Sequence, residues 1–190
     1  RAEKFEDNGP ASIQIKMQDF SQKELEWWAS YGITLPILKK FRVYSCDSIF
    51  LNGNYFASSS EQSPIYGYYK GQKDGLELWR IYFPKRKSYR FLSNWSAKMI
   101  QGLDQLPKKG KLLVITKSLK DVMTFYSCGI PAIAPNSENL FIPPTLFDEL
   151  MAALRAGDAD LAAPTGHAQL LAALGAAVIV IVLALLEPHL

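Results

Sequence analysis

Lys111-Leu-Leu-Val-Ile-Thr-Lys-Ser-Leu-Lys-Asp-Val-Met123 combines a buried strand, a polar turn and the start of a helix. The strand is predicted at Leu112 to Ile115, and the helix is expected to end at Gly129. A second short apolar strand is predicted at Ile130 to Ala134. This order and size predict a βαβ crossover in a parallel sheet, with the polar turn at the carboxyl edge of the first strand. Active sites of open α/β sheets lie at that edge.

Upstream of this unit, residues 43 to 92 alternate short aromatic or apolar runs with turn-forming residues, which predicts a β-rich segment. Asp74-Gly75 between two such runs predicts a hairpin. The expected strands are Val43-Tyr44, Ile49 to Leu51, Tyr66 to Tyr69, Leu76 to Phe83 and Tyr89 to Leu92, and the other expected turns are Asn52-Gly53, Ser58 to Ser60 and Gly71.

The first 42 residues are predicted to contain one strand or loose arm and two short helices. Residues 12 to 17 alternate weakly between polar and apolar, which predicts a strand or a tethered arm. Ser21 and Glu24 have the spacing of a capping box, so a helix is expected from there to about Tyr31. Thr34 is expected to cap the second helix.

Three motifs precede the predicted βαβ unit. In order, they are Trp79 to Pro84 (WRIYFP), Tyr89 to Asn94 (YRFLSN) and Ile100 to Pro107 (IQGLDQLP). Together with the predicted βαβ unit, this order resembles the catalytic core of bacterial-type DNA primases, most closely the divergent primases and primase-helicases of phages. The resemblance covers roughly residues 24 to 145, and several motifs in the correct order are more specific than any single one.

The resemblance implies an α+β chain in two parts, with a Toprim-like parallel α/β domain as the second part. The expected boundaries are an N-terminal arm at 1 to 20, a mixed α/β subdomain that binds the template at 21 to 108, and the Toprim-like domain at 109 to 190. Residues 151 to 190 are compositionally anomalous, since they contain 12 of the 19 alanines and no lysine. They are native to the chain, fused to it or mis-registered, and the sequence leaves these alternatives open.

A Toprim domain holds Mg²⁺ or Mn²⁺ with acidic residues at strand ends, and the metal orients nucleotide phosphates. Asp121 matches one of these acids. Lys117 and Ser118 stand where the family has Glu-Gly, and a lysine cannot bind the metal. Glu138, after the second predicted strand, is a candidate substitute ligand, with a solvated loop acid as the alternative. Lys117 and Lys120 are expected near nucleotide phosphates, although Lys120 also fits an ordinary solvated helix position.

The family's second acidic element is Asp-x-Asp after a third strand, and Asp158-Ala-Asp160 fits it in position. With Asp121, the two aspartates are the predicted catalytic metal ligands. The fit is imperfect, because residues 151 to 156 have few of the β-branched residues that a central strand favours. The alternative is a helix cap or loop in an alanine-rich segment.

Residues 79 to 98 interleave cations with aromatic side chains. Cations compensate phosphates and aromatic faces stack on unpaired bases, so this pattern predicts single-strand binding. The alternative is a hairpin whose aromatic side chains pack in the core while its cations are merely solvated. Strand alternation places Arg80 and Tyr82 on one face and Trp79, Ile81 and Phe83 on the other. The predicted nucleic-acid contacts are Arg80, Lys85, Arg86, Lys87, Arg90 and Lys98.

Composition bounds the remaining possibilities. The net charge is only +3, but 20 of the 21 Lys and Arg residues lie before residue 121. Cys46 and Cys128 match no metal or redox spacing and are expected to be buried, reduced thiols. Primases of the resembled family usually begin with a cysteine-rich zinc module. The sequence has no such module before the core, so the chain is expected to be a fragment of a primase or a primase without this module. A polar N-terminal segment without a signal peptide predicts a cytoplasmic protein of the bacterial host cell.

One competing signal lies in the tail. Leu170 to Leu186 is 17 apolar residues long, the lower limit for a membrane span. Gly175 divides it, and we expect a helix end followed by a buried parallel strand at Val178 to Leu183, so a membrane anchor is the disfavoured alternative.

The function implied by the resemblance is synthesis of short RNA primers on a single-stranded DNA template in phage-type replication. The expected partners are the template, ribonucleotides and a replicative helicase. Loss of the Glu-Gly element leaves a different function class open: a catalytically inactive primase-like module that only binds single-stranded DNA.

Overall fold

The computed structural model describes residues 11–96, 98–108, 112–136, 142–155 and 181–184 of the chain. The fold class is α+β, as predicted. The chain divides into two compact units: unit 1 comprises residues 1–25 and 42–95, and unit 2 comprises residues 26–41 and 96–190. The compact units therefore do not follow the expected boundary at residue 108, because both short helices of the N-terminal region contribute to unit 2. In the described part of the chain, no helix combines the length and apolarity that a membrane span requires.

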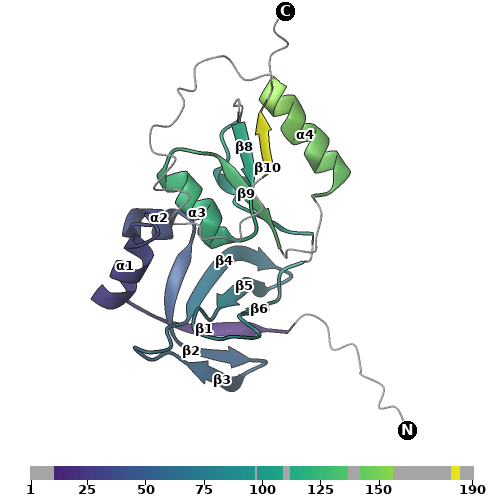
Figure 1. Ribbon diagram of the computed structural model, residues 1–190. Coiled ribbons are helices and arrows are strands. Elements are labelled where there is room, and N and C mark those ends of the chain that lie inside the picture. Colours follow the sequence, from purple (N-terminus) through teal and green to yellow (C-terminus); the bar gives the residue numbers. More distant parts are fainter. Residues whose placement is uncertain (1–10, 97, 109–111, 137–141, 156–180, 185–190) are drawn as a thin grey trace, which may run out of the picture. The chain divides into compact units, whose positions relative to one another are not determined.

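Unit 1 is built on one six-stranded antiparallel sheet (Figure 1). Its strands are β1 (Ile13–Gln18), β2 (Val43–Leu51), β3 (Asn54–Ser58), β4 (Tyr66–Lys73), β5 (Leu76–Tyr82) and β6 (Phe91–Ser93). The order is β1-β2-β4-β5-β6. β3 pairs with the C-terminal end of β2, beyond the part of β2 that pairs with β4. The predicted strand at the N-terminus is thus an integral edge of the sheet and no loose arm.

Two hairpins of this sheet end in the turns that the sequence predicts. Asn52 and Gly53 join β2 to β3, and Asp74 and Gly75 join β4 to β5, all with positive φ. Two successive positive φ values define the type I′ turn, whose twist matches that of the flanking strands. Asn and Gly or Asp and Gly adopt this conformation at low cost, which is why these pairs predict hairpins.

The hydrophobic core of unit 1 lies on one face of the sheet. Trp79 and Ile81 on β5, and Phe83 directly after it, join the cluster of Ile13, Cys46, Ile49 and Ile65. Asn94 ties the two edges of the sheet together: its side chain accepts a hydrogen bond from Trp79 N and donates to the carbonyl oxygens of Glu77 and Ala11. Burial of Trp79 confirms the predicted strand alternation.

Helix α1 (Gln22–Ala29) begins with the predicted capping box. Glu24 accepts a hydrogen bond from Ser21 N at 2.8 Å, and Ser21 Oγ accepts one from Glu24 N at 3.3 Å. The other carboxylate oxygen of Glu24 accepts from Ser45 Oγ on β2, so the cap also ties the start of the helix to the sheet of unit 1. Thr34 occupies the N-cap position of α2 (Leu35–Lys40), but its side chain makes no capping hydrogen bond.

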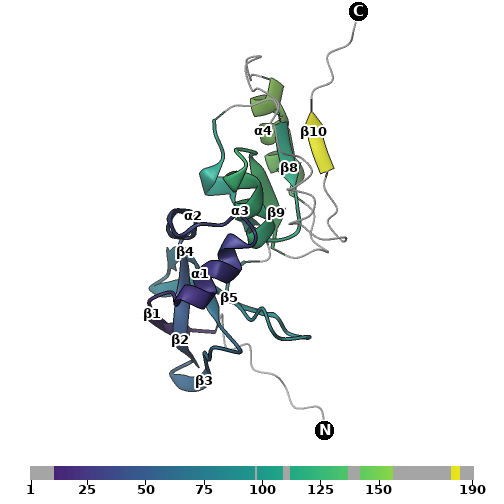
Figure 2. The ribbon, with the colours of Figure 1, turned by 60° about the vertical axis from the view of Figure 1, so that its left-hand side comes forward.

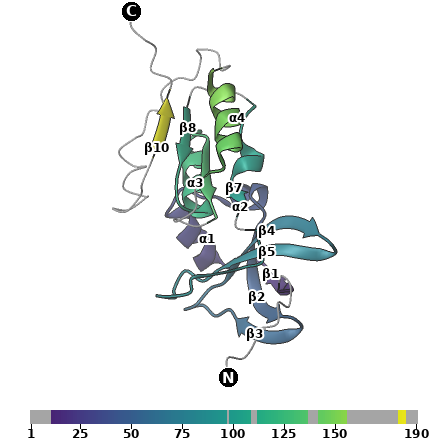
Figure 3. The ribbon, with the colours of Figure 1, turned by 90° about the vertical axis from the view of Figure 1, so that its right-hand side faces the viewer.

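Unit 2 contains a four-stranded mixed sheet in the order β10-β8-β9-β7. The strands are β7 (Ile100–Gln101), β8 (Leu112–Ile115), β9 (Ala132–Pro135) and β10 (Ile181–Ala184), and a 3₁₀ turn, η1 (Leu103–Gln105), follows β7. β8 and β9 are parallel neighbours joined by α3 (Leu119–Ser127), so the predicted βαβ unit is confirmed. Helix α4 (Pro144–Arg155) and α3 lie on opposite sides of this sheet (Figures 1 and 3).

Two predictions about the C-terminal region are wrong. The segment expected to form a third strand at 151 to 156 belongs to α4 through Arg155, since alanine and leucine favour a helix and the segment has no β-branched residue. The expected parallel strand near Val178 to Leu183 is instead antiparallel: β10 pairs in that sense with β8.

Two glycines shape unit 2 around the βαβ crossover. Gly129 has a φ of +74° and ends α3. Gly129 N donates to Tyr126 O and Ile130 N donates to Phe125 O, the pair of bonds that defines a Schellman motif. Gly102, after β7, has a φ of +83°, and a Cβ there would lie 2.6 Å from Val122 and 2.8 Å from Ala132 O. The chain therefore passes directly over α3 and β9 at Gly102.

Candidate nucleic-acid interface

The side chains of β5 that point away from the core form the first part of the candidate interface. Because neighbouring strand residues point to opposite faces, burial of Trp79 and Ile81 in the core directs Arg80 and Tyr82 to the other face. Phe91 on β6 pairs with Tyr82 in the register of the sheet and joins this face. We call Arg80, Tyr82, Arg90 and Phe91 the outer cluster.

The outer cluster is a stack of rings and guanidinium groups. The rings of Tyr82 and Phe91 are parallel within 16°, with centroids 5.0 Å apart. Arg80 lies over the Phe91 ring at 4.2 Å, and Arg90 lies over the Tyr82 ring at 5.5 Å while donating a 2.9 Å hydrogen bond to its hydroxyl oxygen. Tyr82 is buried, but Phe91 keeps 38% of its surface exposed. The partly exposed Phe91 ring is therefore held in a defined orientation beside Arg80.

Burial changes the electrostatics of Arg80. Desolvation lowers the pKa of its guanidinium, and the neighbouring Tyr68 acts in the opposite direction. An arginine remains protonated in a folded protein even so. Arg80 is thus a fixed, partly desolvated positive charge, which interacts more strongly with a phosphate than a fully hydrated one.

The loop between β5 and β6 adds exposed charge. It extends from the sheet (Figure 2), and Lys85, Arg86, Lys87 and Tyr89 are all exposed, with Tyr89 at 88%. The sequence contains no Asp or Glu from Leu78 to Leu103, so no acid within this stretch offsets the cations. A polyanion is the ligand class that this loop favours.

Arg86 belongs to a second group of rings that the sequence did not reveal. Its guanidinium lies 3.6 Å from the ring centroid of Phe83 and 5.8 Å from that of Phe56. Phe56 lies on β3, a strand that was missed because Asn54 and the serines after Ala57 make the segment resemble a loop. The 52–53 turn followed by two aromatic residues is the signal that could have identified it.

Lys98 is exposed and belongs to unit 2, whereas the other five predicted contacts belong to unit 1. Trp79 and Trp95, which the interleaved pattern included, are buried. They belong to the packing of the protein and offer no free face to a base.

The predicted metal site is described only in part. Asp121 is 3% exposed and lies in the first turn of α3, where its Oδ2 accepts hydrogen bonds from Ser118 Oγ at 2.8 Å and Thr116 Oγ1 at 3.5 Å. Asp121 N donates to Ser118 Oγ in return. Ser118 is the N-cap of α3, and its hydrogen bonds with Asp121 connect the polar turn after β8 to the helix. These bonds give the buried Asp121 carboxylate a structural role at the start of the helix.

The remaining members of the predicted metal site stay predictions. Asp158, Asp160 and Glu138 lie outside the described residues. Lys117 is partly exposed in the turn after β8, and Lys120 lies 3.6 Å from the ring centroid of Tyr31. Among the residues that the structure describes, no three His, Cys, Asp or Glu side chains are grouped as metal ligands.

Comparison with protein-family models, curated proteins and solved structures gives no significant match.

Proposed function

We propose that this chain binds single-stranded DNA through the outer cluster and the loop between β5 and β6. The observation that supports this proposal is the stack of Arg80, Phe91, Tyr82 and Arg90, in which the partly exposed Phe91 ring lies beside the guanidinium of Arg80. Bases of a single strand are free to stack on such a surface, whereas bases of a duplex are already stacked on one another.

The loop supplies the electrostatic part of binding. Lys85 and Lys87 are exposed side chains on either side of Arg86, suited to phosphates of a strand whose base rests on the outer cluster. Each phosphate contact releases bound counterions, so the affinity is expected to fall steeply with salt. Neither stacking nor phosphate contact reads a base edge, and we therefore expect little sequence preference.

Fluorescence anisotropy with a labelled oligodeoxythymidylate tests the proposal. We expect tighter binding of the single strand than of a duplex of equal length. The double variant Lys85→Ala/Lys87→Ala should lower the slope of log affinity against log salt by about 0.7 for each lost phosphate contact. Phe91→Ala should weaken binding by roughly 1–3 kcal/mol with an unchanged slope.

A matched control separates local contacts from general charge. Lys39→Ala/Lys108→Ala removes the same charge from exposed positions outside unit 1 and should leave the salt slope nearly unchanged. Equal effects of the two double variants, or equal affinity for duplex and single strand, would contradict a dedicated single-strand surface.

A second function, primer synthesis by a Toprim-type DNA primase, is supported by a different observation. The parallel βαβ unit of β8, α3 and β9 has the polar turn Thr116–Ser118 at the carboxyl end of β8, where the resembled family binds Mg²⁺. Lys117 lies in this turn, and Asp121 lies in the first turn of the helix after it. Incubation with a single-stranded template, ribonucleotides and Mg²⁺ or Mn²⁺ tests the activity. We expect labelled short RNA that EDTA abolishes; binding without any product would leave the single-strand-binding function alone.

A further inference from the structure

We infer that β3 carries a second base-stacking site, formed by Phe56 and Tyr55 beside Arg86. This inference rests on the proposed single-strand binding and extends it to a part of the protein that the sequence motifs do not include. All of its residues belong to unit 1.

A β-bulge makes both aromatic side chains accessible. Ile49 pairs with Ala57 and Phe50 pairs with Tyr55, so Phe56 is an extra residue on β3 without a partner position on β2. In a regular strand, Tyr55 and Phe56 would point to opposite faces and one of them would pack against the core. Here Tyr55 is 64% exposed and Phe56 is 41% exposed.

The surroundings of Phe56 repeat the chemistry of the outer cluster. Its ring centroid lies 6.4 Å from that of Phe83, with a tilt of 58° between the planes. The guanidinium of Arg86 lies against both rings, at 3.6 Å from Phe83 and 5.8 Å from Phe56. An exposed ring next to a cation is again the combination that binds a base and its phosphate.

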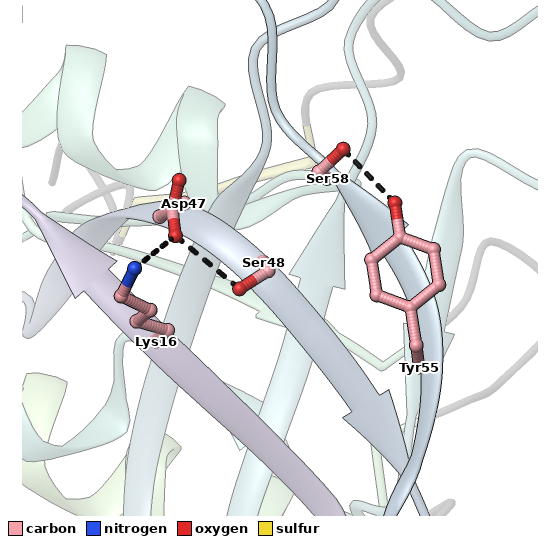
Figure 4. Close-up of polar contacts among 5 residues, drawn as sticks. All are labelled: Lys16, Asp47, Ser48, Tyr55 and Ser58. Carbon is pink, nitrogen blue, oxygen red and sulfur yellow. Dashed lines mark hydrogen bonds and ion pairs between the residues drawn. The ribbon is translucent and has the colours of Figure 1, made fainter.

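Polar contacts orient Tyr55 and compensate Asp47, an acid on the neighbouring strand β2 (Figure 4). The Tyr55 hydroxyl donates to Ser58 Oγ at 3.0 Å, which fixes the ring along β3. On β2, Asp47 accepts a hydrogen bond from Ser48 and forms a 2.9 Å ion pair with Lys16 of β1. The hydrogen bond from Lys16 is the main cause that lowers the pKa of the Asp47 carboxyl. The carboxylate is therefore compensated and repels a nearby phosphate less than a lone acid would.

The two stacking sites lie on opposite faces of the β5–β6 hairpin. Tyr82 belongs to the outer cluster, whereas Phe83, the next residue, contacts the second site. The hairpin continues past them, because Phe83 N donates to Arg90 O at 2.8 Å. A bound strand that uses both sites must pass around the basic loop, so only an oligonucleotide longer than one site can engage both.

Abasic scanning of an oligodeoxythymidylate tests this inference. Chain lengths from about 4 to about 16 nucleotides cover the usual site sizes of single-strand-binding folds. We expect that a long oligonucleotide has two separated positions at which loss of the base weakens binding to the wild type. Phe56→Ala should abolish the effect at one position and weaken binding of the long oligonucleotide by at least about fivefold, with little change for the shortest.

Phe147→Ala is the matched control, because Phe147 is an equally exposed phenylalanine of unit 2 at 37%. Phe56→Trp provides a readout that does not depend on truncation: its additional fluorescence should be quenched when the long oligonucleotide binds.

The outcomes separate the two proposals. Absence of single-strand binding by the wild type would reject the proposed function itself. Binding with one sensitive position, with Phe56→Ala equal to Phe147→Ala and no quenching in the Phe56→Trp variant, would reject the second site and leave the outer cluster as the whole interface. If circular dichroism shows that Phe56→Ala is unfolded, the quenching measurement on Phe56→Trp alone decides whether the second site exists.

Discussion

Tyr89 is the residue whose backbone and side chain are least explained by packing. Its φ of +50° lies in the left-handed region, and its side chain is 88% exposed in the loop between β5 and β6. The left-handed conformation costs a residue with a Cβ roughly 1–2 kcal/mol, which glycine would avoid. The neighbouring hairpin bond between Phe83 and Arg90 and the turn bond from Arg86 N to Phe83 O hold the loop in this form. The proposed single-strand binding by this loop would account for an exposed ring kept at this cost.

Two variants at this position separate the ring from the strain. Tyr89→Gly and Tyr89→Ala both remove the ring, but only glycine relieves the backbone. We expect both to lose the same single-strand affinity, and we expect Tyr89→Gly to unfold at a temperature equal to or above that of Tyr89→Ala. Anisotropy and thermal denaturation measure the two quantities. Unchanged affinity in both variants would show that the ring is merely exposed.

The two cysteines differ in a way that gives a pH prediction. Burial, with a smaller contribution from Glu24, raises the pKa of the Cys46 thiol from about 9 to about 12, whereas Cys128 is exposed. The unfolded thiol ionises first as pH rises, so the folded state binds more protons between these values. The stabilising contribution of Cys46 is therefore complete below about pH 9 and is lost as pH rises towards 12.

Thiol labelling measures the difference in exposure between Cys46 and Cys128. In Cys128→Ser at neutral pH, reaction of Cys46 with a thiol reagent should follow only global or local opening, whereas Cys128 in Cys46→Ser should react as freely as a peptide thiol. The expectation of two buried thiols was wrong for Cys128, because Gly129 ends α3 and leaves Cys128 at its exposed end. Rapid labelling of Cys46 in the folded protein would contradict its burial.

Secondary-structure elements were predictable where local chemistry alone determines them. The capping box at Ser21, the two type I′ turns and the β8–α3–β9 unit follow from short-range patterns. The sequence could not predict the bulge at Phe56 on β3, since the bulge depends on pairing with β2 and not on an intrinsic preference. Nor could it give the antiparallel direction of β10, which tertiary pairing sets. The β3 part of the candidate interface was missed for the same reason.

Gly102, directly after β7, lies so close to α3 and β9 that the packing of unit 2 leaves no space for a side chain there. Gly102→Ala places a Cβ 2.6 Å from Val122 and 2.8 Å from Ala132 O at a φ of +83°. Gly53 has a similar φ of +79°, and a Cβ there would have no atom within 4 Å, so Gly53→Ala is a control for the conformational cost alone. We expect Gly53→Ala to cost about 1–2 kcal/mol of unfolding free energy and Gly102→Ala clearly more, by urea denaturation. Equal costs would mean that the chain near Gly102 shifts without penalty.

For the chain as a whole, the proposed single-strand contacts and the predicted metal ligands belong to different units. The cations that carry the proposed single-strand binding lie in unit 1, whereas Asp121 and the predicted acids Asp158 and Asp160 belong to unit 2. Binding and metal-dependent chemistry are therefore expected to be separable by mutation. A variant that loses one should keep the other, provided that the chain stays folded.

Asp158→Asn/Asp160→Asn tests this separation directly. If the two carboxylates hold Mg²⁺, their loss should abolish primer synthesis, because a neutral amide cannot replace the charge that stabilises the metal and the phosphates. Single-strand affinity should stay within about twofold of the wild type, since the nucleic-acid contacts of unit 1 are unchanged. Primer assays and anisotropy on the same preparations measure both effects. Full activity of the double variant would exclude the Asp158 and Asp160 metal site, and Asp121, whose carboxylate accepts a hydrogen bond from Ser118, would not sustain such a site alone.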